Sequence, residues 1–253
     1  MMNIEEMQHY QALPNILKDK IILVTGASDG IGRVAAKTYA NYGATVLLLG
    51  RDLDKLDTVY DEIEAAGGAQ PAIIPLNFSS ATVADLEKLA LTIEQEFGRL
   101  DGILHCAGIL GDLTPLEMYN PDTWDEVMKI NLRAPYMLTQ QLLPLLKQAP
   151  SASIIFVSSS VGRKARAFWG AYSVSKAGIE NLSALFADEL ANTTNIRVNC
   201  VNPLGTRTAM RAKAYPAEDP MSVYPAEHIM PMFLYLMSDD SKEVNGQSLD
   251  ARK

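Results

Sequence analysis

Short, uninterrupted apolar runs recur along the chain, and a stretch of helical pattern separates each run from the next. Continuous apolar strands are typical of sheets buried on both faces, and strands separated by helices of about ten or more residues run parallel. The pattern therefore predicts an α/β fold, a doubly wound parallel sheet with helices on both faces. The predicted strands are IILVT (21–25), TVLLLG (45–50), PAIIPL (71–76), GILHCA (102–107), SIIFVS (153–158) and IRVNCVN (196–202).

The chain is expected to form a single domain. Its 253 residues suffice for one large core, and no linker, repeat or low-complexity tract divides them. Residues 1–19 are predicted to form an arm that precedes a domain of residues 20–253. Within that domain, residues 205–225 are predicted to form a mobile insertion at the substrate, because prolines and mixed charge interrupt the pattern. The predicted helices cover 31–42, 52–66, 81–97, 121–147 and 171–192.

Charge and composition indicate which classes of binding partner are disfavoured. The formal net charge of −8 disfavours binding to nucleic acid or to an anionic membrane. The N-terminal segment lacks the apolar core of a secretory signal, and no apolar run approaches the ~18 residues of a membrane span. The two cysteines, Cys106 and Cys200, are expected to be reduced core thiols, and no metal site is expected. We therefore expect a cytoplasmic protein without nucleic-acid or membrane partners.

A glycine-rich turn follows the first strand, in the segment TGASDGIG (25–32). Glycines at positions 26, 30 and 32 allow a tight turn, a close approach to a pyrophosphate and a helix that starts near the sheet. The helix N-terminus then offers free amides and a positive dipole end to the phosphates. The turn predicts dinucleotide binding. The alternative, a glycine-rich turn without a ligand, is disfavoured by the strand before it and the helix after it.

The end of the second strand indicates which dinucleotide. A carboxylate there would bond both adenosine-ribose hydroxyls and favour NAD, but the position holds Gly50, and Arg51 follows. A guanidinium grips a 2′-phosphate through parallel hydrogen bonds, so NADP is predicted over NAD. Asp29 argues the other way, because it places a negative charge near that region. The alternative for Arg51 is a solvated arginine at a helix start.

Two side chains suggest proton transfer. Tyr172 and Lys176 are four residues apart in a predicted helix and share a face. A nearby ammonium and a positive nicotinamide ring would bring the pKa of Tyr172 toward the working range. Ser159 follows the fifth strand, where its hydroxyl can bond a substrate oxygen. Asn131 lies inside a predicted helix, where a water or backbone link to Lys176 would satisfy its amide. Taken singly, the tyrosine–lysine pair is an ordinary surface pair and the asparagine a structural one.

In combination, these residues resemble the short-chain dehydrogenase/reductase family over residues 20–250. More narrowly, VTGASDGIGR, SSSVGR, WGAYSVSK and TRTAMRA resemble the YciK-like bacterial oxidoreductases. The resemblance implies a Rossmann-type doubly wound sheet of about seven strands. It also implies an NADP(H)-dependent oxidoreductase that transfers hydride between the nicotinamide and a carbonyl or alcohol substrate. The matching segments are TGASDGIG (25–32), CAG (106–108), Asn131, Ser159, Tyr172, Lys176 and NPLGTRT (202–208).

The resemblance assigns roles residue by residue. Tyr172 would be the general acid/base, and Ser159 would polarise the carbonyl. Lys176 would lower the pKa of the tyrosine and hold the nicotinamide ribose, and Asn131 would anchor a proton-relay water. The implied cofactor-binding residues are Gly26, Ser28, Asp29, Gly30, Ile31, Gly32, Arg51, Asn77, Phe78, Ala107, Gly108, Tyr172, Lys176, Pro203, Thr206 and Thr208. The expected substrate contacts are Ser159, Leu110, Val161, Trp169 and Met210, together with Phe168 and Tyr215.

Three departures from the family pattern stand out. The family's Asn-Ala-Gly after the fourth strand has Cys106 in place of asparagine, which removes hydrogen bonds near the cofactor loop. The usual Pro-Gly after the sixth strand is Pro203-Leu204, which adds a side chain near the nicotinamide. The common Asp-Gly-Gly ending is absent. We expect these changes to tune stability or cofactor affinity without removing catalysis.

Some alternatives stay open at this point. The cations Arg163, Lys164 and Arg166 either attract an anionic substrate or form a plain solvated loop. A non-catalytic NADP-binding sensor on the same fold is the main rival function, and a scaffold without ligand is a weaker one. The resemblance also implies a homodimer or homotetramer, packed through the predicted helices 121–147 and 171–192.

Overall fold

The computed structural model describes residues 2–252. Its core is a seven-stranded parallel sheet with the strand order β3-β2-β1-β4-β5-β6-β7. The first strand lies centrally, so that Val24 pairs with Leu48 on one side and with Leu104 on the other. The predicted fold class is confirmed, and a short seventh strand completes the sheet. The strands are β1 (Ile21–Thr25), β2 (Thr45–Gly50), β3 (Ala72–Pro75), β4 (Gly102–His105), β5 (Ala152–Val157), β6 (Ile196–Asn202) and β7 (Ser248–Asp250).

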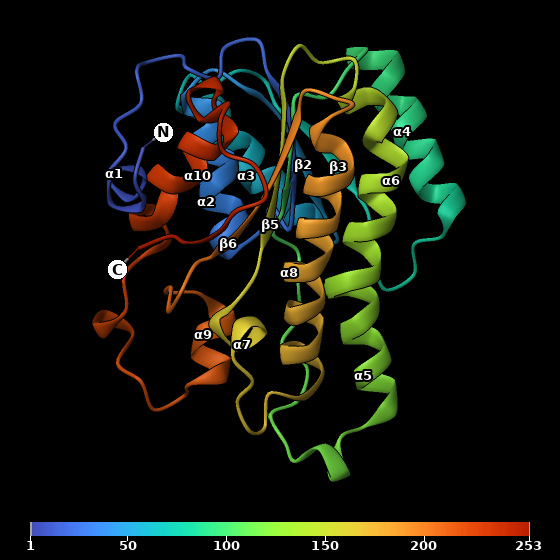
Figure 1. Ribbon diagram of the computed structural model, residues 1–253, viewed down its shortest axis with the longest axis vertical. Helices are drawn as coiled ribbons and strands as arrows, with labels where there is room; N and C mark the ends of the chain where they lie inside the picture. The colour runs from blue at the N-terminus through green and yellow to red at the C-terminus, as the bar shows by residue number, and fades with distance from the viewer. Residues whose placement is uncertain (1, 253) are drawn as a thin grey trace.

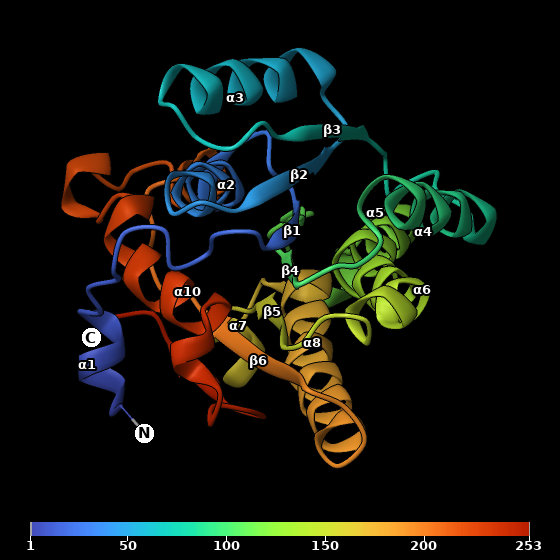
Figure 2. The same ribbon diagram turned by 90° about the horizontal axis from the view of Figure 1, so that it is seen from above.

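Helices cover both faces of this sheet (Figures 1 and 2). One apolar cluster joins the sheet to α2, α3 and α10, and a second joins its other face to α4, α6 and α8. Among the described residues, none of the helices combines the length and apolarity that crossing a membrane requires. The helices are α1 (Ile4–Gln8), α2 (Gly30–Asn41), α3 (Leu53–Ala65), α4 (Val83–Phe97), α5 (Pro121–Met128), α6 (Ala134–Leu146), α7 (Ser160–Arg163), α8 (Gly170–Ala191), α9 (Ala209–Ala214) and α10 (Met230–Met237).

The predicted helix at 121–147 is interrupted. A π-helical turn over Lys129–Arg133 separates α5 from α6, and the amide of Ala134 bonds the carbonyl of Lys129, five residues back. Pro135 explains part of this break, because it has no N–H for the carbonyl of Asn131, four residues before it. The π turn therefore falls where Asn131 turns into the protein, in keeping with the frequent use of such turns at functional sites.

The N-terminal arm packs onto the domain. Met7, Tyr10 and Leu17 are buried in the same apolar cluster as α10, and α1 lies beside the C-terminal segment in Figure 1. The Tyr10 hydroxyl donates to the Asp240 carboxylate at 2.7 Å. The side chain of Gln8 donates to the carbonyl of Asp250, in β7, at 2.9 Å. The arm therefore covers the end of the sheet that carries the last strand.

The predicted insertion at 205–225 has its own internal bonds. It contains α9 and a single 3₁₀ turn at Pro220–Ser222. The Arg207 guanidinium donates to the carbonyls of Pro220 and Val223 at 2.9–3.2 Å and so ties the two ends of the segment together. Its mobility stays a prediction.

A histidine is buried at the end of β4. The ring of His105 stacks on Phe156 with centroids 4.6 Å apart, and its Nε2 shares a hydrogen bond with the Thr139 hydroxyl at 2.8 Å. Burial lowers the pKa of His105 to about 3. The imidazole is therefore neutral in the folded protein over the whole physiological range.

This burial predicts a pH-dependent stability. In the unfolded chain His105 titrates near 6.5, so below that pH the unfolded state binds a proton that the folded state refuses until about pH 3. The free energy of unfolding should therefore fall by about 2–3 kcal/mol from this residue alone between about pH 7 and pH 4.5. Denaturant titrations of the wild type and of His105→Asn should show a shallower fall in the variant, and parallel curves would contradict the prediction.

Candidate functional site

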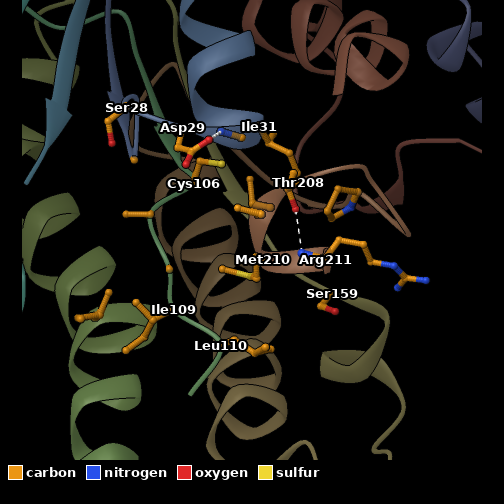
Figure 3. A pocket seen from close by; sticks show the side chains of 18 of the residues that line it. Ser28, Asp29, Ile31, Cys106, Ile109, Leu110, Ser159, Thr208, Met210 and Arg211 are labelled. Carbon is orange, nitrogen blue, oxygen red and sulfur yellow. Dashed lines mark hydrogen bonds between the residues drawn. The ribbon is translucent and has the colours of Figure 1, made fainter. Parts of the chain in front are cut away.

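A cleft of about 560 Å³ opens at the carboxyl ends of the strands. The segments that follow each of the first six strands contribute to its wall, as expected for ligand binding in a doubly wound sheet. Figure 3 shows Ser28, Asp29 and Cys106 at one end of this cleft and Leu110, Ser159 and Met210 at the other. The cleft therefore joins the glycine turn to the expected chemical residues.

The glycine turn packs tightly against the neighbouring backbone. Gly26 has φ +70°, and a Cβ there would lie 2.9 Å from the Cα of Ala107. Gly32 lies beneath the turn, where a Cβ would clash with the carbonyl of Gly26. Asp29 caps α2 by accepting a 2.7 Å bond from the Gly30 amide. The turn and the helix N-terminus thus fit the pyrophosphate of a dinucleotide.

A cation pair lies beyond the turn. Gly50 and Arg51 line the cleft after β2, and Lys55, one helical turn further on, lines it as well. The ammonium of Lys55 lies 3.4 Å from the Asp29 carboxylate, with both side chains about half exposed. The sequence interpretation missed Lys55, because its position beside Asp29 follows only from the folded chain. Asn77 and Phe78 also line this end, as predicted.

Cys106 occupies the position where the family has asparagine. The hydroxyl of Thr25 accepts hydrogen bonds from the amides of Cys106 and Ala107 at 3.0 and 3.1 Å. The amide of Gly32 bonds the Cys106 sulfur, and burial raises the pKa of this thiol to about 11. A neutral thiol therefore lies against the glycine turn, and Thr25 supplies the bonds that tie the end of β4 to β1. Both cysteines are free, as expected.

Tyr172 and Ser159 meet at the other end of the cleft. Ser159 directly precedes α7, Tyr172 lies in the first turn of α8, and the Ser159 hydroxyl is close enough to lower the pKa of Tyr172. Lys176 is buried one turn along α8, and its ammonium donates to the carbonyl of Val157 at 2.7 Å. That ammonium lies 5.7 Å from the centroid of the Tyr172 ring. All three side chains line the cleft.

Burial dominates the electrostatics of the tyrosine. The sequence predicts that Lys176 and a positive nicotinamide ring together bring the pKa of Tyr172 toward the working range, and this joint effect stays a prediction. In the protein alone, burial raises that pKa to about 12. The hydrogen bond from Ser159 lowers it only in part. Burial also lowers the pKa of Lys176, because the ammonium is itself removed from water. Desolvation is therefore the largest influence on the pKa of Tyr172, and the phenol is neutral.

Asn131 is buried behind the cleft wall. Its amide carbonyl accepts from the Ile109 amide at 2.8 Å, and its NH₂ donates to the Ile109 carbonyl at 2.9 Å and to Ser175 at 3.1 Å. Both Asn131 and Lys176 lie close to Gly108, where a Cβ would be 3.3 Å from the Asn131 Oδ1 and 3.8 Å from the Lys176 ammonium. The asparagine thus fixes the loop after β4, and its role with a relay water stays a prediction.

The loop after Ser159 is tied to the last strand. Arg163 donates to the carboxylates of Glu180 and Asp250 at 3.0 and 2.6 Å and to the Leu249 carbonyl at 2.9 Å. The sequence left open whether Arg163 attracts an anionic substrate or lies in a solvated loop, and the three partners of its guanidinium favour a structural role. Gly162 holds α7 directly against Lys176, since a Cβ there would lie 2.7 Å from the Lys176 carbonyl carbon.

Leu204 has a strained backbone in the cleft wall. Its φ is +57°, in the left-handed region that favours glycine, and its amide donates to the Asn202 side chain at 3.1 Å. The departure noted in the sequence thus places a bulky residue where the family has glycine. Pro203, Thr206 and Thr208 line the cleft beside it, as predicted.

The predicted substrate contacts are only partly placed in the wall. Leu110, Trp169, Met210 and Tyr215 line it, whereas Val161 and Phe168 do not. Val161 is buried behind Tyr172 and packs against it, while Phe168 is 58% exposed. Both corrections follow from chain direction, because α7 turns the residues after Ser159 away from the opening.

Comparison with known proteins agrees with this geometry. Residues 20–219 match the model of the short chain dehydrogenase family. The chain is 50% identical to the oxidoreductase YciK of Escherichia coli K12 over 244 residues, 96% of each chain. A short chain dehydrogenase from Pseudomonas syringae superposes with a TM-score of 0.94 at 53% identity, covering 96% of this chain and 98% of that one. A short chain dehydrogenase of Shigella flexneri, complexed with NADP, gives 0.92 at 51% identity over 94% and 99%.

The strain at Leu204 predicts a stabilising substitution. A non-glycine residue in the left-handed region destabilises the folded state by about 1–2 kcal/mol. Glycine removes this strain, but its greater conformational freedom in the unfolded chain offsets part of the stabilisation. Leu204→Gly should therefore raise the free energy of unfolding by about 0.5–1 kcal/mol, measured by denaturant titration. Leu204→Ala is the matched control, because it removes the side chain and keeps the strain. Equal stabilities of the two variants would show that backbone strain is not the cause.

Proposed function

The chain belongs to the short chain dehydrogenase family, and we propose that it is an NADP(H)-dependent oxidoreductase that transfers hydride between the nicotinamide and a carbonyl or alcohol. The observation that carries this proposal is that Ser159, Tyr172 and Lys176 line the same cleft as the glycine turn. One end of the cleft fits phosphates and the other offers a proton donor.

Three features support NADP as the cofactor. The glycine turn and the N-terminus of α2 would hold the pyrophosphate. Arg51 and Lys55 would bind the 2′-phosphate, because both line the cleft beside Gly50 and no carboxylate occupies the place that favours NAD. The short chain dehydrogenase of Shigella flexneri is complexed with NADP.

In carbonyl reduction, Tyr172 would be the proton donor. When bound, the cofactor would supply the hydride. Tyr172 would donate its proton to the substrate oxygen, and with a pKa of about 12 it carries that proton throughout the physiological range. Ser159 would bond the same oxygen. Lys176, oriented by the carbonyl of Val157, would hold the nicotinamide ribose, and Asn131 would keep the Ile109 loop in place.

We further propose that the protein is a homodimer or homotetramer. Tyr136 on α6 and Val174 and Leu185 on α8 are large apolar side chains that stay exposed. Exposed apolar residues on long helices are typical of helix-to-helix interfaces. The cytoplasmic location remains a prediction.

Removing the phenolic oxygen tests the catalytic proposal. Tyr172→Phe should lower the rate of NADPH oxidation with aldehyde substrates by about 10²–10⁴, because the proton donor is lost while the ring still packs. Fluorescence titration should show NADPH binding that is weakened little. Undiminished turnover would contradict the assignment of Tyr172. A wild-type protein that binds NADPH but reduces no carbonyl of a broad panel would be a sensor instead.

Removing the guanidinium tests the cofactor proposal. Arg51→Ala should weaken NADPH binding by about 10- to 100-fold, since a charge-assisted bond to the phosphate is lost, and should leave NADH binding nearly unchanged. Both affinities can be read from the fluorescence of the bound dihydronicotinamide. An equal loss for both cofactors, or no loss for either, would indicate a solvated arginine.

A further inference from the structure

We propose that the substrate is an anion: a carbonyl compound with an apolar, ring-bearing body and an anionic group at the end away from the reacting carbon. The inference rests on the proposed function and specifies its substrate class. It comes from the distribution of charge along the cleft, from one face of α9 and from a row of aromatic rings.

The two ends of the cleft differ in charge. The carboxylates in its wall are those of Asp29 and Asp52, and both lie at the dinucleotide end, in the turns before α2 and α3. At the substrate end the charged residues of the wall are Arg211 and Lys213. In a chain with a net charge of −8, a substrate end lined by cations and no carboxylate is a local reversal.

One face of α9 carries this charge over the chemical residues. Met210, Lys213 and Ala214 are three and four residues apart, so they share a face, and all three line the cleft. Met210 and Ala214 pack on the apolar cluster that contains Leu110 and Tyr172. Lys213 therefore projects from the side of α9 that faces the substrate, and it has no carboxylate partner among the described residues.

Tyr215 organises the cations at the end of α9. The guanidinium of Arg211 lies 3.7 Å from the Tyr215 ring centroid and pairs with Glu218 through two bonds of 2.6 and 2.7 Å. On the opposite loop, Arg166 donates to the Tyr215 hydroxyl at 2.8 Å and pairs with no carboxylate of the described chain. Arg211 is thus neutralised and fixes the tyrosine, while Lys213 and Arg166 keep their charge available.

The row of rings sets the shape of the ligand. The ring of Trp169 lies 5.7 Å from that of Tyr172 and 5.9 Å from that of Tyr215, measured between centroids. Two ring-to-ring steps therefore lead from the proton donor to the tyrosine that holds Arg166. A flat apolar body would lie along this row, with its carbonyl at Tyr172 and its anion between Lys213 and Arg166.

Matched substrate pairs test the inference directly. The probes are 4-formylbenzoate and 6-formyl-2-naphthoate, each compared with its neutral methyl ester, and 4-formylphenyl phosphate as a second anion. With NADPH, the wild type should show kcat/KM at least about tenfold higher for the acid than for the ester, and the ratio should shrink as salt is added. Comparing kcat/KM for the carboxylate and for the phosphate shows which of the two anionic groups the site prefers.

Variants assign the preference to its residues. Lys213→Met and Arg166→Met should each lower the acid-to-ester ratio by about tenfold, mainly through KM of the acid. Lys164→Met is the matched control, because Lys164 carries the same charge on the same loop, whereas Arg166 bonds Tyr215 in the cleft wall, and it should leave the ratio unchanged. Thermal unfolding of each variant separates a binding effect from loss of the fold.

The outcomes separate this inference from the function on which it rests. Two results would overturn the anionic substrate without contradicting the proposed oxidoreductase function. One is turnover that prefers the ester, and the other is an acid preference that both Lys213→Met and Arg166→Met retain. If Lys164→Met lowered the acid-to-ester ratio equally, the preference would come from the net charge of the protein, and the assigned site would be wrong. A protein that binds NADPH and reduces neither member of any pair would overturn function and inference together.

Discussion

The close approach of the β1–α2 turn to the end of β4 is the constraint on which the rest of the site depends. Gly26 and Gly32 have no space for a Cβ. The Thr25 hydroxyl accepts hydrogen bonds from the amides of Cys106 and Ala107, at the end of β4. This packing fixes the N-terminus of α2 over the sheet and sets the floor of the cleft. Everything that the cofactor would meet is positioned relative to it, because the neighbouring strands place their loops from the same edge.

Burial, rather than charge pairing, governs the protonation of the site. It keeps protons on Tyr172 and Cys106, and it opposes the charge of Lys176. A lysine next to a tyrosine in sequence therefore does not ensure an acidic phenol, since desolvation of both groups works against the charged pair.

The sequence predicted those parts of the fold that local patterns encode. The six main strands appear near their predicted bounds because their apolar runs are buried on both faces, and the glycine spacing located the turn. The break at Lys129–Arg133 was missed because a π turn keeps helical periodicity on either side of it. Val161 and Phe168, which were expected at the substrate, lie outside the cleft wall, because a pattern along the chain does not reveal that α7 turns back after one turn. Lys55 was missed because its significance depends on the neighbouring loop of Asp29.

Interactions between the chain ends bear on the geometry of the chemical residues. The carboxylate of Asp250 binds Arg163, beside the serine loop, and also binds the amide of Asn202 at 2.8 Å. Asn202 in turn holds the amide of Leu204 in its strained turn. The arm residue Gln8 binds the carbonyl of the same Asp250. One residue of the last strand thus joins the arm to the loops on both sides of the nicotinamide end, so the N-terminal arm stabilises the site although it lies outside the cleft.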